Sequence, residues 1–578
     1  MSDAFSGGGS FFGRKASEAQ APEVSKLPVV PIVFLPGIMG SNLRVRDSSL
    51  AKVKEKFDQE GKVFTGKAWN PPSVRHSKWL TLKTVLAETL GANSQAVVMA
   101  KTWESYGPKL RQVLLNPDTV EVDEQGFLPS DFPGMREMEG QPPAEVARKR
   151  GWGSVHWDSY GTLLQFLETN LNPTARDDET AIRIRENNVR LGMCFRDAFD
   201  CDQDVVPSKE EILKAVRYRY PVHAMGYNWT QSNLQSAKDV LAKIEACIHS
   251  YQGKGCQCRQ VILVTHSMGG LVGRIASVLN PGLILGVVHG VMPAIGSPDA
   301  YQTMVSGVAR DDTPYLKELN NVFQSIAGRN AAETTPVMAN SPGALELLPS
   351  FLYPPGWLRV ERELGGGRVE EVFKLPSEAG PYSEIYKERE GWWRLVDPNL
   401  LDPAGMDSSS NDAINHFTAW MKYTRRIDGI EIVHKKYLIG KSYHQNTIFF
   451  YGKDKKTYDS SRWMLGIQFA SLDINSLKNN KILIDNLNGL RVLEFHLNKL
   501  INNNVNYQQI SINAYLQSAV GKGDGTVPVQ SGIAPLIFCK YSACLHGINH
   551  VDAFKQPLSK FFSLVSIYKL IGGSSEKN

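Results

Sequence analysis

The stretch VILVTHSMGG, residues 261–270, decides how the rest of this 578-residue chain is interpreted. Its first five residues are apolar or β-branched, which predicts a strand buried on both faces, as in a parallel sheet. A sharp turn follows at Ser267, and residues 270–276 predict a helix. The pattern therefore places a serine at the tip of a strand–turn–helix unit. The alternative is a serine that merely ends a buried strand.

Ser267 has the sequence surroundings of a nucleophile. The stretch follows the G-x-S-x-G pattern of a nucleophile elbow, except that Thr265 occupies the position of the first glycine. A small β-branched residue fits there if the neighbouring helix keeps its distance. The N-terminus of the following helix carries about half a positive charge, which favours an oxyanion above it. We therefore predict Ser267 as the nucleophile and the amide of Met268 as one donor to the oxyanion.

A second oxyanion donor is predicted near the start of the chain. The first core strand is expected over residues 27–35, and it leads into the glycine-rich turn PGIMGSN. Stabilising an oxyanion requires two converging backbone amides, and we assign the second to Ile38. Glycines at 37 and 40 let the backbone approach a substrate closely. The alternative is an ordinary turn between a strand and a helix, but the pairing with the serine turn favours the catalytic interpretation.

A serine nucleophile needs an imidazole base that a carboxylate orients. Asp524 lies at the tip of the glycine turn GKGDGTVP, although such turns also occur without any function. His550 directly precedes the last apolar helical pattern and is the predicted base, with His546 as the alternative. His266 is expected to be structural, because strand alternation points it away from the hydroxyl of Ser267.

Strand and helix patterns alternate on both sides of the serine turn. Residues 220–229 predict a strand that ends in an aromatic turn, and a helix follows from residue 232. Residues 283–292 predict another buried strand. This alternation is typical of an α/β fold with a doubly wound, mostly parallel sheet.

The remaining segments predict large insertions into this core. The expected organisation is a disordered tail over 1–25, a first core part over 26–298 with an aperiodic insertion over about 48–150, a cap or lid over 299–428, a variable Lys/Asn/Ile-rich insertion over 429–519, and a second core part over 520–578. Short strands are expected in the variable insertion at 437–440 and 446–451. Aromatic and leucine clusters in the cap would suit a lipid interface if exposed, and packing inside the cap is the equal alternative.

Composition excludes several classes of protein. The net charge is +5 and no stripe of Lys and Arg is visible, so nucleic-acid binding is not expected. No signal peptide is recognisable, and no apolar run reaches the roughly 18 residues of a membrane helix. The seven cysteines are therefore interpreted as free thiols. The predicted chemistry needs no metal or other cofactor, and a calcium ion bound to the lid stays an open possibility.

The ordered set of motifs resembles the lecithin:cholesterol acyltransferase-like branch of the α/β-hydrolases, which includes lysosomal phospholipase A2 and many bacterial lipases. The matching motifs are LPGIMGS, GYNW, THSMGG, IGSP and GDGTVP, within residues 28–300 and 520–555. The resemblance implies that Ile38 and Met268 supply the oxyanion amides. The Tyr-Asp-Trp motif of the family has Asn228 in place of its aspartate, so any role of that carboxylate is absent here.

The triad and the resemblance together predict a lipase or phospholipase that hydrolyses acyl esters of lipids at a membrane surface. A chain of this architecture without a signal peptide also resembles the phospholipase effectors delivered by type VI secretion. That resemblance implies synthesis in the cytoplasm, export to act on membranes, and an immunity or secretion-apparatus protein as partner. The alternatives are a lipid acyltransferase with the same mechanism and an inactive scaffold that binds lipid or protein.

Overall fold

The computed structural model describes most of the chain. The described residues are 27–70, 95–130, 132, 142–175, 177–200, 205–308, 327–364, 366–406, 412–466, 480–501 and 504–574. The tail expected to be disordered, residues 1–25, lies outside them.

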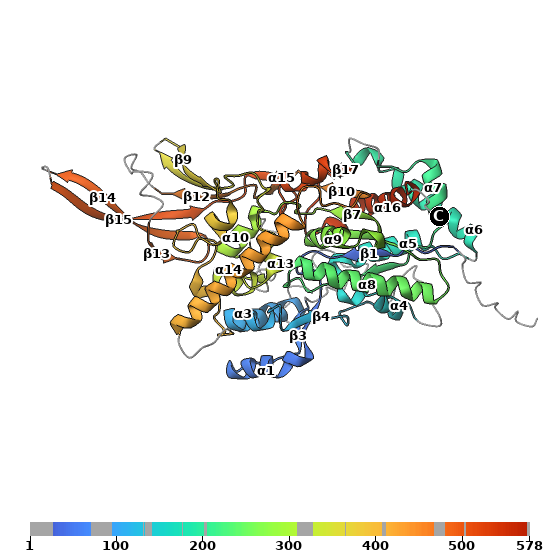
Figure 1. The fold of residues 1–578 in the computed structure, drawn as a ribbon, viewed down its shortest axis with the longest axis horizontal. Helices are drawn as coiled ribbons and strands as arrows, with labels where there is room; N and C mark the ends of the chain where they lie inside the picture. The colour runs from blue at the N-terminus through green and yellow to red at the C-terminus, as the bar shows by residue number, and fades with distance from the viewer. Residues whose placement is uncertain are drawn as a thin grey trace, which may run out of the picture.

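Six parallel strands form the central sheet, in the order β17-β10-β7-β6-β1-β5 (Figure 1). These strands are β1 (Ile32–Leu35), β5 (Val222–Ala224), β6 (Val261–His266), β7 (Ile284–Gly290), β10 (Thr447–Tyr451) and β17 (Tyr541–Cys544). The predicted parallel α/β sheet is thereby confirmed.

Helices cover both faces of the sheet, which explains why its strands are apolar throughout. On β1, Val33 and Leu35 join the apolar cluster under α8 (Asn233–Gly253) and α9 (Met268–Leu279). The alternate residues Ile32 and Phe34 join the cluster of α5 (Trp157–Leu171) and α16 (Pro557–Gly572). Two further helices complete this second side, α6 (Asp178–Met193) and α7 (Lys209–Ala215).

The sheet contains a strand that the sequence places in an insertion. Strand β10 lies between β7 and β17, so the expected variable segment over 429–519 includes part of the core. The strand pattern at 446–451 is visible, but the Lys- and Asn-rich composition around it hides its central position. The strand expected at 437–440 is wrong: these residues form a turn after α14 (Asp412–Lys436), which itself crosses the expected boundary at 428. Four alternating residues are too few to distinguish a strand from a helix end.

The segment over 48–150 is not aperiodic, and it contributes to the core. Its helices include α1 (Leu50–Gln59), α3 (Gln95–Leu114) and α4 (Pro143–Lys149). Two of its strands, β3 (Lys67–Trp69) and β4 (Val120–Val122), pair with β2 (Leu43–Val45), which precedes the segment, in a small antiparallel sheet. Val53, Phe57 and Trp103 are buried in the same cluster as α8 and α9. The helical pattern of α1 was missed because its charged residues outnumber its apolar ones.

The expected cap (299–428) and the expected variable insertion (429–519) are not separate units, because both contribute strands to a second six-stranded sheet, in the order β13-β14-β15-β12-β8-β9, and we refer to the two together as the cap. Its strands are β8 (Leu358–Leu364), β9 (Arg368–Leu375), β12 (Ser461–Leu465), β13 (Ile482–Asp485), β14 (Leu490–Ile501) and β15 (Asn504–Leu516). The hairpin of β14 and β15 projects from one end of the molecule, away from α6, α7 and the C-terminus (Figure 1). Helices α10 (Pro298–Ser306), α12 (Ala331–Met338) and α13 (Pro342–Leu345) connect the cap to the core.

The aromatic clusters of the cap divide between its interior and its surface. Trp392 and Trp393 are buried, whereas Phe351 and Leu352 are 40% and 37% exposed. Among the described residues, none of the helices is both long enough and apolar enough to cross a membrane. The six cysteines within the described residues are free thiols.

Candidate active site

Ser267 occupies a strained turn between β6 and α9. Its backbone has φ 51° and ψ −123°, a conformation that a residue with a side chain rarely adopts. The turn is held on both sides, because the amide of Ser267 donates to Gly290 O and the amide of Gly270 donates to Ser267 O. This strand–turn–helix geometry holds the serine at the carboxyl end of the central sheet, where α/β folds place their reactive groups.

The threonine that departs from the elbow pattern is accommodated by a glycine on the helix. A Cβ atom on Gly273 would lie 3.0 Å from Cγ2 of Thr265, so the absence of that atom makes room for the threonine methyl. The hydroxyl of Thr265 lies 2.7 Å from Nδ1 of His289, within hydrogen-bond distance. The condition that the helix must leave space for Thr265 is thus met by Gly273.

The structure brings together the three residues predicted as a triad. Nε2 of His550 lies 2.8 Å from Oγ of Ser267, and Nδ1 of His550 lies 2.8 Å from Oδ2 of Asp524. A carboxylate only accepts, so Nδ1 carries the proton and Nε2 is left to accept from the serine hydroxyl. All three side chains are buried. A buried serine, imidazole and carboxylate in one hydrogen-bonded line can perform acyl transfer.

The glycine turn holds the Asp524 carboxylate in place. Asp524 follows β16 (Gly521–Gly523), and its Oδ1 accepts from the amides of Thr526, at 3.0 Å, and Val527, at 2.7 Å. The amide of His550 donates to the backbone carbonyl of Asp524 as well. Since one carboxylate oxygen is fixed by backbone amides, the other is oriented toward the imidazole.

His546, the alternative base, lies apart from the serine. Its side chain is 55% exposed and contacts the carboxylates of Asp200 and Asp454. Of the two histidines that the sequence left open, His550 is the one that contacts the serine.

The loop with the predicted oxyanion donor lies directly against the serine turn. A Cβ atom on Gly37 would lie 3.0 Å from Cβ of Ser267, and one on Gly269 would lie 2.4 Å from Pro36 O. Ile38 follows in the same loop, and Met268 is the first residue of α9. Glycine at 37 and 269 thus allows the close approach of the two segments that contain Ile38 and Met268.

Three contacts fix the shape of this loop. The amide of Gly40 donates to Gly37 O, at 3.0 Å. Nε1 of Trp69 donates to Met39 O, and the hydroxyl of Tyr227 donates to Pro36 O, each at 2.7 Å. Such a preformed loop does not need to reorganise when charge develops on a substrate oxygen.

Sequence reasoning missed a hydrogen-bonded chain that joins the loop to the base. The amide of Gly37 donates to the Tyr160 hydroxyl, the hydroxyl donates to Nδ1 of His266, and Nε2 of His266 donates to His550 O. A carbonyl only accepts, so the direction of every bond in this chain is determined. Burial lowers the pKa of His266 to about 3, so this ring stays neutral.

His266 therefore has more than a packing role. Its ring nitrogens contact the Tyr160 hydroxyl and the backbone carbonyl of His550, so the ring links the oxyanion loop to the segment of the base. The only sequence signal for this contact is the aromatic-rich stretch GWGSVHWDSYG, residues 151–161, which contains Tyr160. That stretch does not indicate which residue Tyr160 contacts.

Asp299 adds a further titratable group beside the triad. It lies in the first turn of α10, which begins directly after Ser297. Burial raises the pKa of its carboxyl to about 7, with opposing contributions from His550, which lowers it, and Asp524, which raises it.

Comparisons with known proteins agree with this geometry. The family model described as lecithin:cholesterol acyltransferase matches residues 213–356, which include the serine turn. A chain of the crystal structure of the Tle4–Tli4 complex is 28% identical, with a TM-score of 0.66, and the match covers 94% of this chain and 99% of that chain. The chain has the α/β-hydrolase fold, and the segment around its serine turn is similar to the lecithin:cholesterol acyltransferase family.

The hydrolase also matches phospholipase PlaB from Legionella pneumophila, with 11% identity over 56% of this chain and 85% of that chain. The TM-score of that match is 0.13, which is too low to support any conclusion. No curated protein matches the hydrolase. The predicted fold and family resemblance are confirmed by the first two matches, and the hydrolase is an enzyme of the esterase or acyltransferase type that acts on lipids.

Proposed function

We propose that the hydrolase is a serine lipase or phospholipase that cleaves acyl esters of membrane lipids. The observation that carries this proposal is the hydrogen-bonded line from Ser267 through His550 to Asp524, with 2.8 Å at each step. The relation to lecithin:cholesterol acyltransferase supports a lipid ester as the substrate.

The proposed reaction follows from the positions of these groups. Ser267 attacks the ester carbonyl while Nε2 of His550 takes the serine proton. Asp524 stabilises the imidazolium, which then protonates the leaving alcohol. The amides of Met268 and Ile38 bind the oxyanion, and loss of one such donor is expected to slow the reaction by roughly a hundredfold or more. Water, deprotonated by His550, then releases the fatty acid from the acyl-enzyme.

The similarity to the Tle4–Tli4 complex extends the proposal to partners and location. It supports export by a specialised secretion system, so that the enzyme reaches the membranes of another cell. A toxic lipase requires protection of the cell that makes it, and a protein similar to Tli4 is the proposed immunity partner. Residues Phe351 and Leu352, exposed on the cap, offer an apolar surface for contact with lipid.

The deciding experiment is fatty-acid release from phospholipid vesicles and from neutral-lipid emulsions. Wild type is compared with Ser267→Ala, and with Ser277→Ala as a matched control, because Ser277 also lies on α9 but its hydroxyl donates to Gly273 O within that helix. We expect release by wild type and by the control and none by Ser267→Ala. The same comparison between His550→Ala and the exposed His249→Ala tests the base.

Two outcomes would contradict the proposal. Release by Ser267→Ala at the wild-type rate would remove the serine mechanism. Folded wild type that neither releases fatty acid nor reacts with a fluorophosphonate probe would favour the inactive scaffold. Acyl transfer is distinguished by adding a lipid alcohol, since a transferase forms a new ester in place of free fatty acid.

A further inference from the structure

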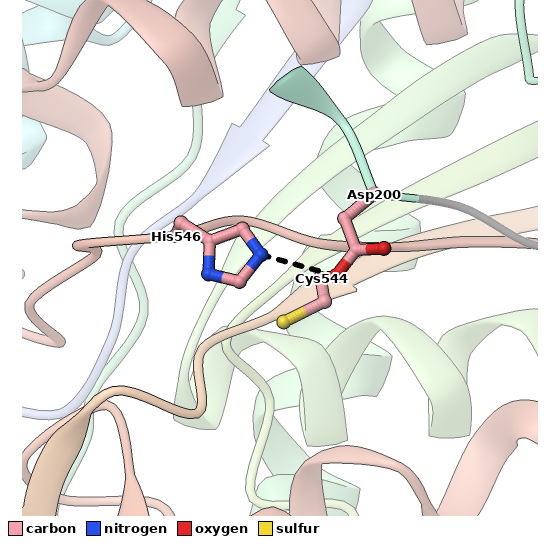
Figure 2. Close-up of side chains that lie close together, drawn as sticks. All are labelled: Asp200, Cys544 and His546. Carbon is pink, nitrogen blue, oxygen red and sulfur yellow. Dashed lines mark hydrogen bonds and ion pairs between the residues drawn. The ribbon is translucent and has the colours of Figure 1, made fainter. Parts of the chain in front are cut away.

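A cluster of metal-binding side chains lies at the carboxyl edge of the central sheet, outside the triad. Side-chain ligand atoms of Asp200, Cys544 and His546 all lie within 4.8 Å of one another (Figure 2). Cys544 ends β17, and the amide of Cys544 donates to the backbone carbonyl of Asp200. The three residues therefore meet because a backbone hydrogen bond joins the end of β17 to the loop that carries Asp200.

The imidazole of His546 is oriented as a metal ligand would be. Its Nε2 faces Asp200 at 3.1 Å, while its Nδ1 lies 3.2 Å from Oδ2 of Asp454. The same carboxylate oxygen of Asp454 accepts from the amide of Gly547, at 2.8 Å. Histidine ligands of metals commonly donate their second ring nitrogen to a carboxylate, which fixes the ring and makes it more basic.

A lysine supplies positive charge to the cluster. Nζ of Lys453 lies 3.0 Å from Oδ2 of Asp200, and Lys453 also interacts with the thiol of Cys544. Its side chain is 41% exposed, so it can move into solvent. Because an ammonium group already lies against the Asp200 carboxylate, the cluster attracts positive charge.

We propose that Asp200, Cys544 and His546 form a zinc-binding site. Asp454 is the carboxylate that orients the imidazole, and water completes the four-coordinate shell. A thiolate, an imidazole and a carboxylate suit Zn²⁺, whereas Ca²⁺ and Mg²⁺ prefer oxygen ligands alone. On binding, the thiol releases its proton to water and Lys453 leaves the site. The ligands must approach one another by about 1 Å to reach tetrahedral geometry, and two of them are on the surface, where they can move.

The site lies on the segment that leads to the catalytic base. His546 precedes His550 by four residues, and Asp454 holds the segment through Gly547. Bound zinc would join this segment to Asp200, so we expect zinc to raise the melting temperature of the protein. This inference does not depend on the proposed lipase function, because zinc binding and stability are measured without a substrate.

The test measures zinc binding to full-length protein that has been stripped with EDTA and dialysed. A chelating zinc indicator competes for Zn²⁺, and thermal unfolding is followed with and without Zn²⁺. We expect Cys544→Ser and His546→Ala to weaken binding by at least about tenfold, and Asp454→Asn by about 10- to 100-fold. Cys194→Ser is the matched control, because Cys194 is an exposed thiol outside the cluster.

Lys453→Met provides a test with the opposite sign. If the ammonium competes with zinc, this variant binds Zn²⁺ more tightly than wild type. If Lys453→Met binds Zn²⁺ no more tightly than wild type, the ammonium does not occupy the position of the metal, and this outcome would overturn the proposal. Wild-type zinc affinity in both Cys544→Ser and His546→Ala would overturn it too, because the metal would then bind elsewhere. We expect Asp200→Asn, changed at an exposed position, to lose zinc affinity as well, and circular dichroism checks that this variant is folded.

Discussion

At the scale of single residues, the site depends on side chains that never touch a substrate. Tyr160 and His266 form a continuous line of hydrogen bonds from the oxyanion loop to the backbone of His550. Tyr160 and His266, which this line joins, are 106 residues apart in the sequence. Because each bond has a determined direction, removal of one hydroxyl leaves both a donor and an acceptor without a partner in a buried place.

We expect Tyr160→Phe to slow the reaction of Ser267 with a fluorophosphonate by about tenfold, which corresponds to one hydrogen bond of about 1.4 kcal/mol. The amide of Gly37 loses its acceptor, so the loop that carries Ile38 is less well held. Tyr220→Phe is the control, because its buried hydroxyl donates to Ala215 O at the end of α7. Equal labelling rates for Tyr160→Phe and wild type would contradict the positioning role.

The carboxyl of Asp299 should make the reactivity of Ser267 depend on pH. Its pKa of about 7 means that the carboxyl is mostly neutral at pH 6 and mostly ionised at pH 8. Negative charge near His550 stabilises the imidazolium formed during attack. Asp299→Asn should therefore label at nearly the wild-type rate at pH 6 and severalfold more slowly at pH 8.

The measurement is the labelling rate of Ser267 over this pH range, with the exposed Asp58→Asn on α1 as control. A variant that is slower than wild type by the same factor at every pH would show that Asp299 acts by packing and not by charge.

At the scale of elements, the serine turn depends on how closely α9 packs on β6. Gly273 and Thr265 are complementary, because the missing Cβ of one is the space for the methyl of the other. Thr265, two residues before the nucleophile, is therefore accommodated here by the absence of a side chain at Gly273.

We expect Gly273→Ala to lower the free energy of unfolding by about 1–3 kcal/mol, the usual cost of overpacking. Thr265→Ser removes Cγ2 and keeps the hydroxyl near His289, so the double variant should recover most of the loss. Denaturant unfolding measures the cycle. Gly429→Ala on α14 is the control, because an added Cβ there meets nothing within 4 Å. Additive effects of the two substitutions would contradict the complementarity.

At the scale of the whole molecule, the cap and the core are joined by buried polar contacts. Glu346, which follows α13, accepts from the hydroxyl of Ser232, at 2.8 Å, and from the amide of Asn233, at 3.0 Å, at the start of α8. His434 on α14 donates from Nε2 to Glu346 O, which adds a third element to the junction.

Glu346→Ala should destabilise the molecule by about 1–3 kcal/mol, because it leaves buried donors unsatisfied at the α8 N-terminus. Glu390→Ala, at a side chain that is 90% exposed, should have little effect. The melting temperature of each variant gives the comparison, and an unchanged value for Glu346→Ala would show that the junction does not hold the cap.

The sequence alone determined the local chemistry of this protein. The nucleophile turn at Ser267, the glycine turn at Asp524 and the last histidine before the final helix are short-range patterns, and each survives in the structure because it depends on neighbours along the chain. The alternation of apolar strands and amphipathic helices likewise predicted the parallel sheet.

Only the tertiary structure decided which distant residues complete these patterns. Strand β10 joins the central sheet from within a segment of surface-like composition. Tyr160 on α5 contacts His266 at the end of β6, although the two elements are far apart in the sequence. His550 rather than His546 faces the serine for the same reason. Local patterns depend on backbone geometry over a few residues, whereas long-range contacts depend on how all the elements pack, which no short stretch of sequence contains.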